Sequence, residues 1–96
     1  MIIQLKKFGT TLTSRQLGKE ALAAFLPSLA AVKADEIVEV DFGGVNTFSP
    51  SWADEFLTPL FKRYRERFIL KYSDNPSVIV TLKLLEEING LKFNRK

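Results

Sequence analysis

The stretch VDFGGVNTFSPSWADEF, residues 40–56, holds the side chains of this chain that are best placed for chemistry. Two serines, Ser49 and Ser51, flank a proline, and two carboxylates, Asp54 and Glu55, follow within one helical turn. Because proline favours the first position of a helix, Ser49 is predicted to be the cap, with Ser51 inside the first turn. In the alternative arrangement, Ser51 is the cap and Asp54 is the acid of a capping box. The first arrangement leaves the hydroxyl of Ser51 available for regulation.

The composition excludes several kinds of catalytic site. The chain lacks cysteine, so it has no thiolate and no disulfide. It also lacks histidine, which is the commonest general base and the commonest metal ligand. A serine–histidine nucleophile cannot be built from this chain alone. The adjacent acids Asp54–Glu55 and Glu86–Glu87 do not face each other on a helix, and Gly43–Gly44 is not followed by the residues of a phosphate-binding loop. We therefore expect a protein that is not an enzyme and has no metal or cofactor.

The net charge is +3, and basic residues gather in two segments. These are Lys62–Arg67, KRYRER, and a basic C-terminal tail over residues 91–96. An alternative function follows from them, a weakly basic nucleic-acid-binding domain that uses both segments. The more ordinary interpretation is a solvated helix face and a frayed tail. The chain start is not that of a signal peptide and no apolar run has membrane-spanning length, so we expect a cytoplasmic protein.

Alternating apolar residues predict three strands, around residues 2–6, 37–42 and 67–72. Apolar residues at helical spacing follow each strand. The second predicted helix follows Ser49, carries apolar residues on one side from Trp52 to Tyr64, and is expected to bend at Pro59. The third has Asn75 as its cap and ends at Gly90.

The first predicted helix begins near residue 13, where Thr13 fits a capping box and Ser14 is the alternative cap. Gly18 is interpreted as a close packing point, and Pro27 is expected to kink or end the helix. Arg15 opposes the helix dipole, so it either pairs with Asp54 or Glu55 across the sheet edge or keeps its head in water. The inward face is predicted to hold Leu17, Ala21, Ala24, Phe25, Ser28, Leu29 and Val32.

The element order is therefore βαβαβα in one domain, residues 1–96. It predicts an α/β superhelix of successive βα units with a mostly parallel three- to four-stranded sheet. Polar residues alternate with the core residues of the strands, which places the helices mainly on one face. The second face is then open to the tail, to another copy in a homodimer, or to a different partner.

Parallel βα units bring every strand-to-helix turn to one edge of the sheet, where ligands and partners usually bind. Three helix N-termini also point there, with their free N–H groups. We expect a partner-binding site at this edge, formed by Ser14, Arg15, Asp41, Ser49, Ser51, Trp52, Asp54 and Glu55.

The stretch around Asp41 resembles the core signature of STAS domains, the class of anti-sigma-factor antagonists. The chain is also similar over nearly its whole length to a subgroup of STAS-like domains of uncharacterised function, found in bacteria and phages. It shares with them a start of the form fG…SR..G, here Phe8–Gly9, Ser14–Arg15 and Gly18. It also shares a centre of the form DF.GV..iS.SfadE, here residues 41–55.

This resemblance implies the same superhelix of βα units and a non-enzymatic role in binding a partner, often a histidine-kinase-type ATPase. Ser51 falls on the position of the serine that is phosphorylated in anti-sigma-factor antagonists. The chain departs from their pattern on both sides of it, with Ser49 in place of an acid and Trp52 in place of glycine.

Overall fold

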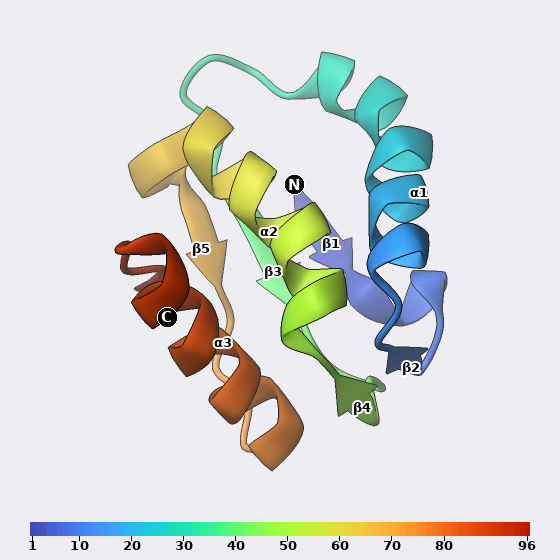
Figure 1. The fold of residues 1–96 in the computed structure, drawn as a ribbon. Helices are drawn as coiled ribbons and strands as arrows, with labels where there is room; N and C mark the ends of the chain where they lie inside the picture. Colours follow the sequence, from blue (N-terminus) through green and yellow to red (C-terminus); the bar gives the residue numbers. More distant parts are fainter.

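All three α-helices of the computed structural model lie on the same side of its main sheet (Figure 1). The structure describes residues 1–96. The elements in chain order are β1 Ile2–Gln4, η1 Leu5–Phe8, β2 Thr11–Leu12, α1 Arg15–Phe25, η2 Leu26–Ala31, β3 Val38–Asp41, β4 Thr47–Phe48, α2 Pro50–Tyr64, η3 Arg65–Arg67, β5 Phe68–Leu70, α3 Pro76–Asn89 and β6 Asn94–Arg95, where η marks a 3-10 helix.

The main sheet is parallel throughout, with the strands in the order β1-β3-β5-β6. Val40 at its centre is in register with Ile3 on one side and Leu70 on the other. This sequential order and the one-sided helices confirm the predicted fold class. They follow from the alternation in the strands, since Val38 and Val40 are fully buried while Glu39 and Asp41, which alternate with them, are not.

The core fills the space between the sheet and the helices. An aromatic cluster lies at its centre, where Trp52 stacks on Phe56 with ring centroids 5.0 Å apart. Phe8 and Phe48 pack against the same indole ring, at 6.1 and 5.8 Å. Large side chains from η1, β4 and α2 therefore hold the helix-start edge to the core. No helix of the chain has the length and apolar character that crossing a membrane requires.

A second parallel sheet, which the sequence did not predict, consists of β2 and β4. The backbone N–H groups of Asn46 and Thr47 both donate to the carbonyl of Thr10, and that of Ser49 donates to the carbonyl of Leu12. Two-residue strands are too short for a visible alternation. This small sheet directly precedes the starts of α1 and α2, so it positions the expected site.

The predicted basic tail is wrong as a description of residues 91–96. Phe93 is only 3% exposed and packs edge to face on Phe61, with centroids 5.4 Å apart. Asn94 and Arg95 form β6, which pairs with β5. The physical reason is the single aromatic residue within the basic segment. Its burial draws the chain back along the sheet after the left-handed turn at Gly90, whose φ is +61°.

The predicted inward face of the first helix is partly wrong. Leu17 is 57% exposed, and the neighbouring Gly18 is the buried residue. Ala24 and Ser28 are also exposed. Ser14 is the cap, and the Thr13 capping box does not form. The helix rotates in this way because Gly18 allows α1 to approach α2 closely, as described below.

The predictions for the end of the first helix and for both ends of the third are confirmed, while the bend at Pro59 stays a prediction. α1 ends at Phe25, and the chain passes Pro27 as a 3-10 helix. α3 has Asn75 as its cap and Gly90 as its stop. α2 continues through Pro59 up to Tyr64.

Candidate functional site

Each of the three α-helices begins with a side-chain cap. The Ser14 hydroxyl accepts from the N–H of Leu17 at 3.2 Å, and the side-chain amide oxygen (Oδ1) of Asn75 accepts from the N–H of Ser77 at 2.8 Å. The Ser49 hydroxyl accepts from the N–H of Trp52 at 3.5 Å. The caps satisfy N–H groups that have no partner within the helix, so each helix has a defined starting residue.

The helix starts are also bonded to one another, which the sequence did not reveal. The Ser49 hydroxyl donates to the carbonyl of Thr13 at 2.9 Å and so joins α2 to the start of α1. The side-chain amide of Asn75 donates to the carbonyls of Val45 and Asn46, at 2.8 and 3.1 Å, and so joins α3 to the loop before β4. The three turns therefore lie at one edge, as predicted, and side-chain hydrogen bonds hold them together.

The backbone of Phe48 at this edge is held by two hydroxyl side chains of α3. Its backbone N–H donates to the Ser77 hydroxyl, which in turn donates to the Phe48 carbonyl, each at 2.8 Å. The buried Thr81 hydroxyl donates to the same carbonyl at 2.8 Å. Ser77 and Thr81 lie four residues apart on α3 and thus face β4 together.

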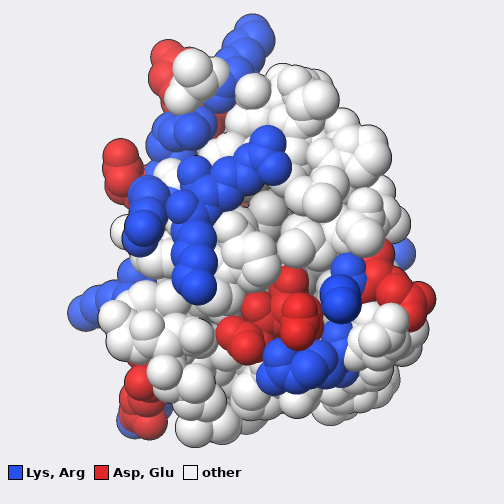
Figure 2. Space-filling model, turned by 45° about the horizontal axis from the view of Figure 1, so that its top comes forward, with Lys and Arg blue, Asp and Glu red and all other residues white.

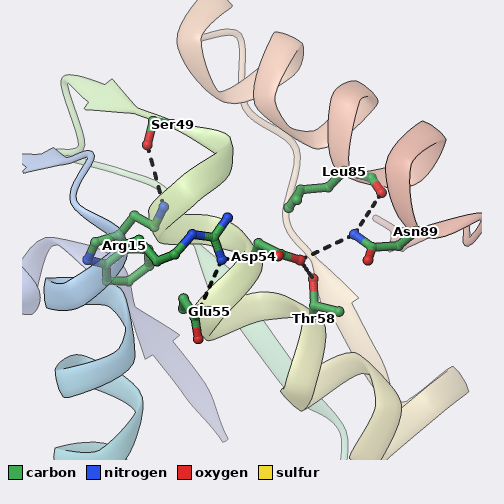
Figure 3. Close-up of polar contacts among 8 residues, drawn as sticks. Arg15, Ser49, Asp54, Glu55, Thr58, Leu85 and Asn89 are labelled. Carbon is green, nitrogen blue, oxygen red and sulfur yellow. Dashed lines mark hydrogen bonds and ion pairs between the residues drawn. The ribbon is translucent and has the colours of Figure 1, made fainter.

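Arg15 reaches across from α1 to the first turns of α2 (Figure 3). Its guanidinium lies 2.9 Å from a carboxylate oxygen of Glu55 and 3.4 Å from one of Asp54. The hydrogen bond to Glu55, and next the one to Asp54, raise the pKa of Arg15 above its usual value. Of the two alternatives for Arg15, the structure shows the pairing with the acids of α2. The carboxylates offset the unfavourable position of a cation at a helix start.

Asp54 joins all three helices. Besides Arg15 of α1, it accepts from the Thr58 hydroxyl at 3.0 Å and from the side-chain amide of Asn89 at 3.3 Å (Figure 3). Thr58 is four residues further along α2, a spacing that could have been read from the sequence. Asn89 is at the far end of α3, so only the tertiary structure brings it to Asp54.

Ser51 has the spare hydroxyl that the cap assignment predicted. Since Ser49 caps α2, the side chain of Ser51 lies within the first turn, is partly exposed and makes no hydrogen bond inside the chain. Ser51 also precedes Asp54 and Glu55 by three and four residues, so it lies on the same helix face as the acidic pair.

Trp52 does not belong to the predicted partner-binding surface. It is 1% exposed, and its indole lies within the aromatic core described above. Trp52 is the next residue after Ser51, and consecutive helical positions point in different directions. The bulky ring therefore points into the protein and leaves the Ser51 side open.

Asp41 lies apart from Ser51, Asp54 and Glu55. One of its carboxylate oxygens accepts from the backbone N–H of Gly43 at 2.9 Å and closes the turn after β3. Asp41 also lines a surface hollow of about 460 Å³, together with the Gly43–Gly44 turn, Tyr72 and Asp74. The hollow is at the carboxyl ends of β3 and β5, so Asp41 shares the edge with Ser51 but not its immediate surroundings.

Basic side chains gather on the face that carries the end of α2 (Figure 2). Lys62, Arg63 and Arg65 are exposed there. Arg67 is different, because it donates to the carbonyls of Lys33 and Glu36 at 3.3 and 3.0 Å. It therefore holds the loop before β3. In segment 62–67, which the alternative nucleic-acid hypothesis uses, Arg67 thus has a structural role, while Lys62, Arg63 and Arg65 stay exposed.

These elements define an α/β domain of successive βα units with a bonded helix-start edge. The family described as "STAS-like domain of unknown function" matches residues 25–77, more than half of the chain. The chain belongs to this family of STAS-like domains, as the resemblance predicted. No curated protein and no solved structure matched the chain.

Proposed function

We propose that this chain is a small regulatory module that binds another protein through the edge around Ser51. The observation that carries the proposal is the division of roles between two serines. Ser49 caps α2 and bonds Thr13, while Ser51, two residues further along the chain, presents an unbonded hydroxyl. A side chain without a structural bond, at an edge of bonded ones, is free to make contacts with a partner.

The rigidity of this edge supports a binding role. Partners that are already ordered lose less conformational freedom when they associate. Here the cross-links of Ser49 and Asn75 and the bonds of Asp54 fix the backbone around Ser51 before any partner arrives.

The partner proposed is a kinase-type ATPase or a sensor, as the likeness to anti-sigma-factor antagonists implies, with Ser51 as the residue that it modifies. A phosphoryl group adds a charge of about −1.5 to −2 and three acceptor oxygens. At the first turn of α2 this charge faces free N–H groups and the positive end of the helix dipole. Modification should therefore keep the fold intact and act through the interface instead.

The sign of the effect follows from the acids already present at this edge. Asp54, Glu55 and Asp74 lie at this edge and Arg15 offsets only part of their negative charge, so a partner fitted to the edge meets one more negative charge after modification. A like-charge mismatch at an interface costs up to several kcal/mol. Modification of Ser51 thus releases the partner.

The proposal is tested with Ser51→Glu and Ser51→Ala, with Ser28→Glu as the control at an exposed serine of η2. A partner is first identified by pull-down and mass spectrometry, and its affinity is then measured by calorimetry. We expect all three variants to keep the circular dichroism of the parent and only Ser51→Glu to bind more weakly. If Ser51→Glu binds as tightly as the parent, the edge is not the docking site. The exposed basic residues of segment 62–67 then become the next candidate, tested by salt-dependent binding to duplex DNA.

A further inference from the structure

The face of the main sheet that points away from the helices carries an ordered arrangement of charge. Its outward side chains are Ile2 and Gln4 on β1, Glu39 and Asp41 on β3, and Ile69 with the following Lys71 on β5. We call this surface the open face. Ile2 is 56% exposed, and Ile37 just before β3 is 40% exposed.

The charges of the open face form two neighbouring strips. The acidic strip is Glu39 and Asp41 on β3. The basic strip lies beside it, because the N–H of Lys71 donates to the carbonyl of Val40 and continues the β3–β5 ladder, which sets Lys71 next to Asp41. Lys96 follows β6, and its side chain reaches across β5 so that its ammonium lies 3.2 Å from a carboxylate oxygen of Glu39. Glu39 is thus paired within the chain, and Asp41 and Lys71 are the two charges left for a partner.

The geometry points to a second copy of this chain as the partner of the open face. A twofold axis parallel to the strands, between β3 and β5, places β3 of each copy over β5 of the other. Asp41 then stands opposite Lys71 of the partner subunit, and the same pair forms a second time on the other side of the axis. Aligned packing of two sheets about 10 Å apart is an ordinary arrangement, with the strands crossing at about −30°.

Charge complementarity favours a second copy of this chain over a partner whose surface carries charge of only one sign. A purely basic or purely acidic surface would attract one strip and repel the other. A twofold axis along β3 itself would place Asp41 over Asp41. Only the axis between the two strips sets the acidic strip of each copy opposite the basic strip of the other. This axis also places the two Ile69 side chains close to it, one on either side.

The dimer leaves the edge around Ser51 accessible, because the open face and the helices lie on opposite sides of the sheet. The inference is therefore independent of the proposed function. The main sheet has only short strands of two to four residues, so a contact through this face is expected to bury less than the about 800 Å² per partner of stable complexes. Association should accordingly depend on protein concentration.

The test is sedimentation velocity of the parent and of charge-reversal variants over a wide range of concentration. We expect the parent to form dimers as its concentration rises. Lys71→Asp alone and Asp41→Lys alone should each dimerise more weakly by about tenfold or more, because each places like charges opposite each other twice. An equal mixture of the two variants should regain dimers, since both pairs across the axis are then of opposite sign.

Lys83→Asp, at an exposed position of α3, is the matched control and should dimerise as the parent does. Asp41 also closes the turn at Gly43, so circular dichroism checks the fold of Asp41→Lys. If that variant does not fold, Lys71→Asp and Ile69→Lys decide the question, and both must lose the dimer. The inference is overturned if the parent stays monomeric at all concentrations, if folded variants fail to recover in the mixture, or if Lys83→Asp has the same effect as Lys71→Asp.

Discussion

Ser49 and Ser51 are two positions apart and have different roles because a helix start needs only one cap. Pro50 fixes the first helical position, so the residue before it is extended and its hydroxyl turns back toward the free N–H groups. Ser49 then bonds both Trp52 and Thr13, and Ser51 bonds neither.

Ser49→Ala should therefore destabilise the fold more than Ser51→Ala does, by about 1 kcal/mol, which is the usual cost of a lost cap. Urea unfolding of the two variants beside the parent measures the difference. If Ser51→Ala proved the more costly change, Ser51 would be the cap and its hydroxyl would not be free.

Arg65 holds the least favourable backbone conformation of the chain. It follows α2 with φ +53° and ψ −121°, and it is the only non-glycine residue with positive φ. An L side chain in such a region costs about 1–3 kcal/mol, whereas glycine adopts it freely.

Arg65→Gly should raise the free energy of unfolding by about 1 kcal/mol, because the relief of strain exceeds the extra entropy of glycine in the unfolded chain. Arg63→Gly is the control, since it lies in the last turn of α2 and should lose about 1 kcal/mol through poorer helix propensity. Thermal and urea unfolding decide the matter, and equal losses in both variants would contradict the argument from strain.

At the scale of elements, Gly18 sets the distance between α1 and α2. A Cβ at this position would lie 2.6 Å from the carbonyl oxygen of Trp52 and 3.0 Å from its Cα. These are backbone atoms, which cannot move aside as a flexible side chain can. The close approach is also what lets Arg15 reach Asp54 and Glu55.

Gly18→Ala should destabilise the protein by about 1–2 kcal/mol. Forced separation of packed helices typically costs about 1–3 kcal/mol, and better helix propensity returns up to about 1 kcal/mol. Ala23→Gly, at an exposed position of the same helix, measures the propensity term alone. A Gly18→Ala variant more stable than the parent in urea would show that the two helices are not in close contact.

At the scale of the whole molecule, the last residues complete the sheet rather than extend from it. β6 closes the edge beside β5, and the Phe93 ring fills the space against Phe61. Arg95 pairs with Glu86 of α3 at 2.9 Å and ties β6 to the helix layer. The segment thus joins both layers of the fold.

Phe93→Ala should cost about 3 kcal/mol, at the lower end of the range for buried phenylalanine. Lys92→Ala, next to it and exposed, should change the free energy of unfolding by less than about 0.5 kcal/mol. Chemical unfolding of both variants makes the comparison. Equal and small effects would mean that residues 91–96 are a tail after all.

The sequence by itself determined what depends on near neighbours. Strand alternation showed which side chains of β3 point to the core, and Pro50 and Pro76 located the starts of α2 and α3 together with their caps. The order of these elements then implied a parallel sheet with helices on one side. The spare hydroxyl of Ser51 followed from the same local reasoning, whereas the sequence left open whether Arg15 pairs with Asp54 and Glu55, about 40 positions away.

Only the tertiary structure decided what depends on residues distant along the chain. The bond from Ser49 to Thr13 spans 36 positions, that from Asn89 to Asp54 spans 35, and neither leaves a periodic signal. β2, β4 and β6 are too short to alternate, so their pairing is visible only once the long elements have packed. The exposure of Leu17 was also set at this level, because the contact of Gly18 with α2 fixes the rotation of α1 against a helix more than 30 residues away.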